Sequence, residues 1–441
     1  MSVSITGSTT SRSEGVLVLP EPGLISLAHI RDLRPGTVLC HETDKASAAE
    51  QFPNSRIVTY ASGSLTPARA DLNELTALVA PVTDAILVRD EDRRHGWDAY
   101  ITALGLMGAT RITLLGQSGS NSVQAQPKGD MAEARSLLLS ACGGIGNVIQ
   151  TTPLLAAAMD LGLKTYFLPL ADTPGVSLAS LFRGAADGLT VIGPEDLDHI
   201  KADIRLNIEA RAYRTGGEYF HSPYREPGDR PEPEAYAQFF KNVTGIRPDP
   251  IRTFVGGFDA AIPASRRGRV VLCPGSKAGW DSKRWPHFAA LAARLDRPLI
   301  LCREADLDAY DRLDFLHALR GVDAEFVTDA SLPEAAAILR AARLVIANDC
   351  GLAHLAAATG AATLVLFGPS SKSKNQPLAP NAVSISLDLA CQPCQGRQSG
   401  PGRLGPGEFS CEIGYPCLKD LSPDRVLAEA DALLNASEAT A

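Results

Sequence analysis

Short apolar runs rich in β-branched residues recur along this chain, and each is followed by a segment in which apolar residues have helical spacing. The first five runs are VLVLP (16–20), TVLC (37–40), RIVTY (56–60), AILVRD (85–90) and RITLLG (111–116). Short runs that are apolar throughout are typical of strands buried on both faces of a parallel sheet. Strands that alternate with helices in this way predict an α/β protein.

Interruptions of this pattern divide the chain of 441 residues into three α/β blocks, which agrees with a prior of about 150 residues per domain. The predicted parts are a flexible tail at 1–14, a small α/β domain at 15–117, a polar linker at 118–133, and two further domains at 134–262 and 263–441. The last two domains each open with a strand, a Gly-containing loop and a helix. This order predicts twin Rossmann-like domains that face each other across a cleft.

Composition excludes several classes of protein. The residues are 45% hydrophobic and 21% charged, as in ordinary globular proteins, and the net charge of −8 argues against nucleic acid as the partner. The first residues lack the apolar core of a signal peptide, and no stretch approaches 18 consecutive apolar residues. We therefore expect a cytoplasmic protein, in which the nine cysteines are reduced or bind metal.

The sequence GGIGN (143–147) lies between a predicted strand at 134–141 and a helical segment. Glycines at this place, here Gly144 and Gly146, let the backbone approach a ligand and leave amide groups directed at it. Tight strand-to-helix turns without any ligand have the same composition. The motif therefore leaves a ligand loop and a purely structural turn as alternatives.

A second candidate loop, CPGSKAGWDSKRWP (273–286), follows the predicted strand at 269–276. It carries hydroxyl and cationic groups that suit a phosphate, on Ser276, Lys277, Lys283 and Arg284. The alternative is a solvated run of charges on the surface. The Gly-Ser turn and the two tryptophans of the loop favour a phosphate site.

A third candidate loop, NDCGLAH (348–354), lies between a buried strand and an Ala-rich helix. The free amides at the start of that helix would attract an anion, and His354 lies on its first turn. A histidine at a helix start is, taken alone, more often structural. FGPSS (367–371) ends the next strand, so these loops meet at the carboxyl edge of one parallel sheet, where such folds bind ligands.

A cysteine cluster lies in a Gly/Pro-rich loop at 391–417, with the spacing C-x2-C-x16-C-x5-C. Four thiolates at this spacing fit tetrahedral zinc or a single iron ion. Unligated thiols or a redox pair are the alternatives. The candidate metal ligands are Cys391, Cys394, Cys411 and Cys417.

Together these motifs resemble glycosyltransferase family 9, the heptosyltransferases. The resemblance covers about residues 135–436 and is carried by GGIGNVIQTTPLLAAAMDLG (143–162), PGSKAGWDSKRWP (274–286), LVIANDCGLAHLAAATG (344–360), LVLFGPSS (364–371) and the cysteine loop. It implies the two-domain GT-B fold. It also implies inverting transfer of a sugar, ADP-heptose being the expected donor, to a glycolipid, polysaccharide or protein acceptor.

The resemblance also implies roles for individual residues. Ser276 and Lys283 would contact the donor phosphates, and the diphosphate and sugar would lie among Asp349, Gly351 and His354. Glu304 matches an acidic position near the nucleotide ribose. Lys283 would stabilise the charge that develops on the leaving diphosphate, so that no divalent metal is required at the reaction centre. In one branch of relatives, which glycosylates bacterial surface proteins, four cysteines hold an iron ion.

One position departs from the family pattern. Relatives usually end the first glycine loop in an Asp that serves as general base, whereas this chain has Asn147. An amide cannot accept the proton, although it can orient an acceptor hydroxyl. Either another group is the base, with Asp172, Glu218 and His221 as candidates by position, or the acceptor differs, or the chain is an inactive nucleotide-sugar-binding protein. A nucleotide-sugar epimerase of the same fold is a second alternative, which the GSKAGWDSKRWP block argues against.

Two regions fall outside these motifs. We hypothesise that the domain at 15–117 recognises the acceptor or mediates assembly, for which a homo-oligomer is one form. Residues 208–240 are rich in aromatic residues, Arg and Glu and predict a surface-facing helical or loop region. Within them, Arg211–Arg225 is a candidate for peripheral contact with the inner membrane, with an ordinary surface loop as the alternative.

Overall fold

The computed structural model describes residues 16–31, 33–61, 65–79, 83–88, 97–117, 119–126, 128–222, 230–256, 258, 260–277, 279–308, 317, 319–395 and 411–440. By their contacts these residues form two compact units. The smaller unit contains the chain up to Ala134 together with 216–226 and 238–247. The larger unit contains 135–215, 227–237 and the chain from Pro248 onward.

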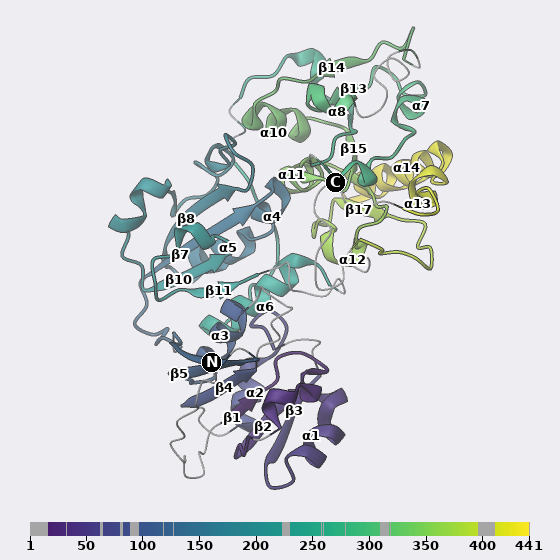
Figure 1. Cartoon of the computed structure of the whole chain (residues 1–441). Helices are drawn as coiled ribbons and strands as arrows, with labels where there is room; N and C mark the ends of the chain where they lie inside the picture. Colours follow the sequence, from purple (N-terminus) through teal and green to yellow (C-terminus); the bar gives the residue numbers. More distant parts are fainter. Residues whose placement is uncertain are drawn as a thin grey trace. The chain divides into compact units, whose positions relative to one another are not determined.

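The smaller unit is built on a six-stranded sheet with the order β3-β2-β1-β4-β5-β6 (Figure 1). Its strands are β1 (Val16–Val18), β2 (Thr37–His41), β3 (Arg56–Tyr60), β4 (Asp84–Val88), β5 (Arg111–Gly116) and β6 (Gly119–Gln124). The helices are α1 (Lys45–Gln51), α2 (Leu72–Leu78) and α3 (Trp97–Leu106). The first five strands are parallel, as their apolar sequences predict. Strand β11 (Tyr219–His221) also belongs to this unit, and the backbone N–H of its Phe220 donates to Thr102 Oγ1 of α3 at 2.9 Å.

Strand β6 lies within the stretch that the sequence predicts to be a linker. It pairs antiparallel with β5, from Arg111 opposite Gln124 to Gly116 opposite Gly119. Its sequence, GSNSVQ, contains one apolar side chain, so periodicity gives no signal for a strand. An edge strand is held by backbone hydrogen bonds to a single neighbour and needs little apolar surface.

The first sheet of the larger unit contains four parallel strands in the order β10-β7-β8-β9. They are β7 (Ser136–Gly143), β8 (Lys164–Ala171), β9 (Leu189–Val191) and β10 (Ile204–Ile208). Helices α4 (Ile145–Ile149) and α5 (Thr152–Asp160) connect β7 to β8. The carboxyl end of β7 thus leads directly into the first glycine loop.

Helix α6 (Glu232–Thr244) corrects the expectation of a surface-facing region at 208–240. Tyr236, Phe239 and Phe240 are fully buried. These aromatic residues recur at i, i+3 and i+4, which places them on one face of a helix. Glu232, one turn before Tyr236, is buried as well and accepts a hydrogen bond from the Tyr236 hydroxyl at 3.1 Å.

The second sheet of the larger unit has six parallel strands in the order β14-β13-β12-β15-β16-β17. They are β12 (Val270–Cys273), β13 (Leu299–Leu301), β14 (Glu325–Val327), β15 (Leu344–Asn348), β16 (Thr363–Leu366) and β17 (Ala382–Ile385). The helices are α7 (Phe288–Ala292), α8 (Glu304–Asp308), α10 (Leu332–Arg340), α11 (Gly351–Thr359), α12 (Lys372–Asn375), α13 (Pro416–Lys419) and α14 (Pro423–Thr440). The strand order reverses between β12 and β15, and such a switch point is where open α/β sheets bind ligands.

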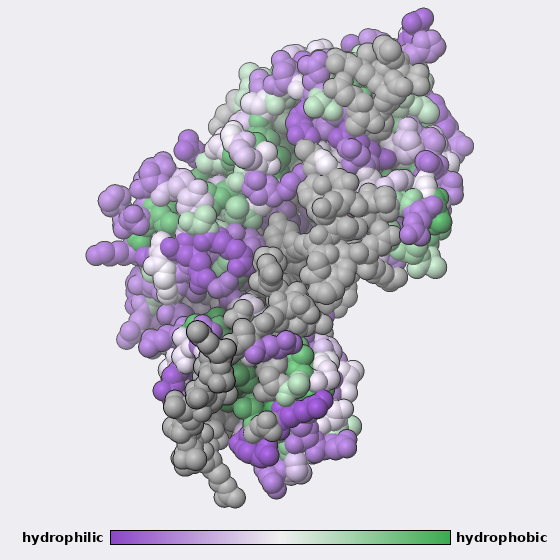
Figure 2. Space-filling model, in the orientation of Figure 1, coloured by the Kyte–Doolittle hydropathy of each residue, from purple (hydrophilic) through white to green (hydrophobic). Residues whose placement is uncertain are grey.

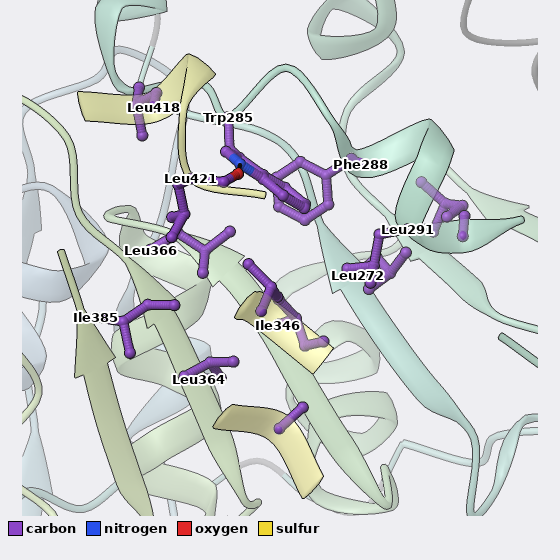
Figure 3. Packing of buried hydrophobic residues seen from close by; sticks show 14 of the residues in the cluster. Leu272, Trp285, Phe288, Leu291, Ile346, Leu364, Leu366, Ile385, Leu418 and Leu421 are labelled. Carbon is purple, nitrogen blue, oxygen red and sulfur yellow. Dashed lines mark hydrogen bonds between the residues drawn. The ribbon is translucent and has the colours of Figure 1, made fainter. Parts of the chain in front are cut away.

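The loop that follows β12 is anchored in the core of this second sheet (Figure 3). Trp285 is fully buried beside Phe288 and Leu291, and its indole nitrogen donates to the carbonyl of Leu421 at 2.7 Å. Because the tryptophan cannot move without opening the core, the residues just before it, including Lys283, are held in place. On the face shown in Figure 2, hydrophilic residues cover much of the described surface, with hydrophobic areas among them. Among the described residues no helix is long and apolar enough to cross a membrane.

Candidate functional site

The first glycine loop turns from β7 into α4 under close packing. A Cβ added at Gly143 would lie 2.9 Å from Cβ of Asn147, and one added at Gly146 would overlap the imidazole ring of His354. Gly144 caps α4 in an extended conformation, and a Cβ there would make only ordinary contact. Packing therefore requires two of these glycines, with no ligand present. This favours the structural interpretation of Gly143 and Gly146.

The loop after β15 meets the first loop from the other side. A Cβ added at Gly351 would lie 2.9 Å from Cβ of Ile145, the first residue of α4. Gly351 and Gly146 thus let the N-terminal ends of α11 and α4 come together. The two candidate loops, predicted from separate sequence blocks, form one region of the larger unit.

Asn348 joins the loop after β15 to the loop after β12. Its amide nitrogen donates to the carbonyl of Pro274 at 2.6 Å, and its amide oxygen accepts from the backbone N–H of Trp285 at 3.0 Å. The side chain is fully buried. Both loops are therefore fixed relative to each other before any ligand binds.

Lys283 and Asp349 form the central ion pair of this region. The Lys283 ammonium lies 2.7 Å from the Asp349 carboxylate, and the two side chains are only 15% and 6% exposed. Burial alone would raise the pKa of Asp349, but the Lys283 charge and hydrogen bond lower it below the ordinary value. Lys283 also lies over the Trp280 ring, 5.6 Å from its centroid. The cation is thus held firmly near the N-terminal end of α11.

His354 is buried in the first turn of α11 and is uncharged at neutral pH. Burial lowers its pKa to about 4, with the nearby Lys283 charge acting in the same direction and Asp349 opposing it. A neutral imidazole can still donate or accept one hydrogen bond, but it cannot neutralise a phosphate. The cationic part of the site is therefore Lys283.

The other predicted phosphate contacts are engaged within the protein. Ser276 Oγ accepts from Arg284 Nε at 3.0 Å, and Arg284 also pairs with Asp306 at 3.1 Å. Lys277 pairs with Asp172 on the exposed surface. Of the four side chains singled out in this loop, Lys283 is the one that reaches the loop after β15.

Glu304, the predicted ribose contact, begins α8 and is exposed. The buried carboxylate of that turn is Asp306, which the motifs did not single out. Asp306 pairs with Arg303 at 2.9 Å as well as with Arg284, and a Cβ added at Gly275 would lie 2.6 Å from its Oδ2. The sequence signal for Asp306 is Gly275, directly before Ser276, because a glycine at this position makes room for the Asp306 carboxylate.

Glu232, at the start of α6, is a second carboxylate that the motifs did not single out. Its Oε2 accepts hydrogen bonds from Asn147 at 3.3 Å, from Gln150 at 3.2 Å and from Tyr236 at 3.1 Å. Its Oε1 lies 4.0 Å from Nζ of Lys374. The residue is 5% exposed and is separated from Asn147 by 85 positions in the sequence.

The three bases suggested by position lie in two different units of the chain. Asp172 follows β8, where its N–H donates to the carbonyl of Gly143, but its carboxylate pairs with Lys277. Glu218 and His221 are buried and belong to the smaller unit, whereas Asn147 belongs to the larger one. In the membrane candidate, Arg211–Tyr213 forms an exposed turn, and residues 223–229 lie outside the described part of the chain.

The four cysteines of the predicted metal site all lie in the described part of the chain: Cys391 is exposed, Cys394 and Cys411 are half-buried, and Cys417 is buried. Burial raises the pKa of Cys417 to about 11, and the charges of the other three thiols add to this effect. Within the described residues, no group of three or more His, Cys, Asp or Glu side chains is positioned to hold a metal ion. The metal site stays a prediction.

Comparison with known proteins supports the assignment reached from the motifs. Residues 249–403 match glycosyltransferase family 9 (heptosyltransferase). Lipopolysaccharide heptosyltransferase 2 of Escherichia coli K12 is 31% identical over 186 residues, 40% of this chain and 49% of that protein. Lipopolysaccharide heptosyltransferase 1 of Pseudomonas aeruginosa is 30% identical over 165 residues, 36% of this chain and 46% of that protein. The chain thus spans about half the length of the curated relatives it matches.

Solved structures show the same fold. The structure of E. coli ADP-heptose lps heptosyltransferase II has a TM-score of 0.50 at 19% identity, covering 69% of this chain and 99% of that one. E. coli heptosyltransferase WaaC with ADP has a TM-score of 0.50 at 16% identity, covering 68% and 99%. These matches confirm the GT-B fold of two Rossmann-like domains, with an additional α/β region at the N-terminus. The resemblance to family 9 is confirmed by the family match at residues 249–403 and by the curated relatives.

Proposed function

We propose that this chain, which resembles glycosyltransferase family 9, transfers a heptose or related sugar from a nucleotide-diphosphate donor to a hydroxyl group of a glycolipid, polysaccharide or protein. The anomeric carbon is inverted in the reaction. The single observation that carries the proposal is the buried pair of Lys283 and Asp349, held at the switch point between β12 and β15.

The pair supplies what the leaving group of such a reaction needs. As the bond between the sugar and the diphosphate breaks, negative charge develops on the phosphate oxygens. A cation that is already oriented in a water-poor site stabilises that charge without reorganisation. The amides at the start of α11, a helix of nine residues, add their partial positive charge at the same place. Ser276, Gly351 and the neutral His354 complete the proposed donor site.

An adenine nucleotide is the proposed donor base. The names of the two similar solved structures contain ADP-heptose and ADP, which supports this choice. Glu304, exposed at the start of α8, is the proposed contact of the ribose hydroxyls. Gly144 and Gly146 are proposed to let the sugar approach the backbone of the first loop.

Calorimetric titration with ADP, UDP and GDP tests the donor site. We expect ADP to bind with the highest affinity, and Lys283→Ala to weaken it about 10-fold to 100-fold, because a charge-assisted hydrogen bond contributes about 1.5–3 kcal/mol. Lys372→Ala is the matched control, since Lys372 is a cation near the same sheet edge that pairs with Asp388 instead. Equal affinity of the wild type and Lys283→Ala for ADP would contradict the proposed site.

The replacement of the expected base by Asn147 favours a second candidate, a nucleotide-sugar-binding protein without transferase activity. The two candidates differ in the fate of the donor. A transferase releases ADP from ADP-heptose, by transfer or by slow reaction with water. A binding protein holds the same donor with the same dependence on Lys283 and releases no ADP.

The four cysteines are proposed to hold a structural iron or zinc ion. The donor set suits either metal, and the thiols are near enough to raise one another's pKa. Four thiolate ligands leave no position for a substrate, so a bound metal would fasten the loop at 391–417 and take no part in the transfer. Metal analysis of the purified protein should give one ion per chain. Cys391→Ser with Cys394→Ser should remove it, and equal metal content in both proteins would contradict the assignment.

A further inference from the structure

A buried carboxylate lies against the side chain that stands in the place of the expected base. Glu232 and Asn147 are hydrogen-bonded within the larger unit, so the start of α6 comes to the first glycine loop. We propose that Glu232 is the general base that takes the proton from the acceptor hydroxyl. This inference rests on the proposed function.

The two oxygens of the Glu232 carboxylate have different surroundings. Three donors, on Asn147, Gln150 and Tyr236, converge on Oε2. Oε1 lies 4.0 Å from Nζ of Lys374, beyond hydrogen-bonding distance. Oε2 thus fixes the orientation of the group, and Oε1 keeps lone pairs with which it can accept a proton. A carboxylate that served only to fasten α6 would use both oxygens.

Asn147 has a positive role in this arrangement. Its amide nitrogen donates to Glu232, which an Asp at the same position could not do without carrying a proton itself. Two carboxylates in contact would repel each other, and one of them would become protonated and lose its function as a base. The amide at position 147 and the carboxylate at position 232 therefore belong together.

Glu232 also lies between the two Rossmann-like parts of the larger unit. Asn147 and Gln150 lie in α4 and at its C-cap, after β7 of the first Rossmann-like sheet, whereas Lys374 belongs to α12, which follows β16 of the second. Gly146, next to Asn147, packs against His354 of the donor loop. The carboxylate is therefore placed where an acceptor on the first domain would meet a donor sugar on the second.

In the proposed step one bond forms at the anomeric carbon, one breaks, and Glu232 takes the proton. The acceptor oxygen forms a bond to the anomeric carbon while its proton passes to Oε1 of Glu232. The bond from that carbon to the diphosphate breaks, and the electron pair leaves with ADP, whose charge Lys283 stabilises. Protonated Glu232 then returns its proton to solvent. No oxidant, reductant or metal ion is consumed.

The test measures ADP release from ADP-heptose with water as the surrogate acceptor, together with ADP affinity by calorimetry. Glu232→Gln keeps the shape of the side chain and an oxygen that accepts hydrogen bonds. We expect it to lower the rate of ADP release about 100-fold or more, the usual contribution of a general base, and to leave the affinity for ADP within about twofold. Glu234→Gln, which removes a charge two positions further along the same helix, is the matched control and should release ADP at the wild-type rate.

A second variant tests whether the carboxylate itself is required. Asn147→Asp combined with Glu232→Gln exchanges the amide and the carboxylate across the same hydrogen bond. We expect the exchange variant to release ADP at least tenfold faster than Glu232→Gln. If Glu232→Gln fails to fold, activity in the folded exchange variant together with its loss in a folded Glu232→Ala variant still supports a carboxylate at this hydrogen bond as the base, whereas a folded exchange variant without activity contradicts it.

The outcomes separate this inference from the proposed function. ADP release by the wild type that Glu232→Gln leaves unchanged would overturn the inference alone. ADP binding that depends on Lys283, without any ADP release by the wild type, would leave a binding protein and overturn both the transferase and its base. Loss of ADP release in Asp172→Asn with full release in Glu232→Gln would assign the base to Asp172.

Discussion

Two strand-to-helix turns of the larger unit, β7 to α4 and β15 to α11, have the same backbone plan but draw their charged groups from different places. At the turn from β15 to α11, the loop carries its own carboxylate, Asp349, and a lysine 66 positions earlier neutralises it. At the turn from β7 to α4, the loop carries the amide of Asn147, and the carboxylate comes from α6, 85 positions later. Glycine packing fixes where the turns lie, so the charged group at either turn can come from a distant segment.

Removal of Lys283 should affect the first of these turns most strongly. Lys283→Ala leaves the Asp349 carboxylate buried without its cation, which typically costs about 3–5 kcal/mol of unfolding free energy. Lys277→Ala breaks the exposed pair with Asp172 beside the other turn and should cost about 1 kcal/mol or less. Urea denaturation of the two variants measures the difference. Equal losses would mean that the burial of the Lys283 pair has no energetic consequence.

Titration of His354 should give the next largest effect. Its pKa is about 4 in the folded protein against an ordinary value of 6.5, so between these values the unfolded chain binds a proton that the folded chain does not. Stability is therefore complete above pH 6.5 and falls as the pH decreases to about 4, by roughly 3 kcal/mol in total. Below pH 4 this histidine contributes no further loss.

His354→Asn isolates this contribution from that of other titrating groups. Denaturation midpoints of both proteins, measured from pH 7.5 to 4, should show the wild type losing its advantage as the pH falls. Parallel pH profiles for the two proteins would mean that His354 has the same pKa in the folded and unfolded states, which would contradict the lowered pKa.

The donor turn could be predicted from the sequence because its chemistry is local. Lys283, Asp349 and His354 occur in short blocks at the ends of parallel strands, and such ends meet at one edge of a sheet. Glu232 could not be found in this way. From the sequence, a glutamate in the first turn of a helix is expected to complement the helix dipole. Only the tertiary fold brings Glu232 to Asn147. Strand β6 could not be predicted for a different reason. Five of its six residues, GSNSVQ, are Gly, Ser, Asn or Gln, so its sequence has no apolar periodicity.

The smallest loss of unfolding free energy is expected at Gly146, where α4 packs against His354 of α11. Gly146→Ala would place a Cβ inside the His354 ring, which is buried and cannot swing away, so we expect a loss of about 1–3 kcal/mol of unfolding free energy. Gly144→Ala is the matched control, because the added Cβ would lie 3.4 Å from Oδ1 of Asn147 in ordinary contact and the backbone at this cap is extended.

Thermal denaturation of these two variants distinguishes packing from backbone freedom at the first loop. If both variants lose the same stability, the conformational freedom of glycine matters and the contact with His354 does not. If only Gly146→Ala is affected, the close approach of α4 and α11 explains the glycine. The added methyl group would then displace His354, and ADP affinity should fall together with stability, because the position of the donor loop depends on the turn beside it.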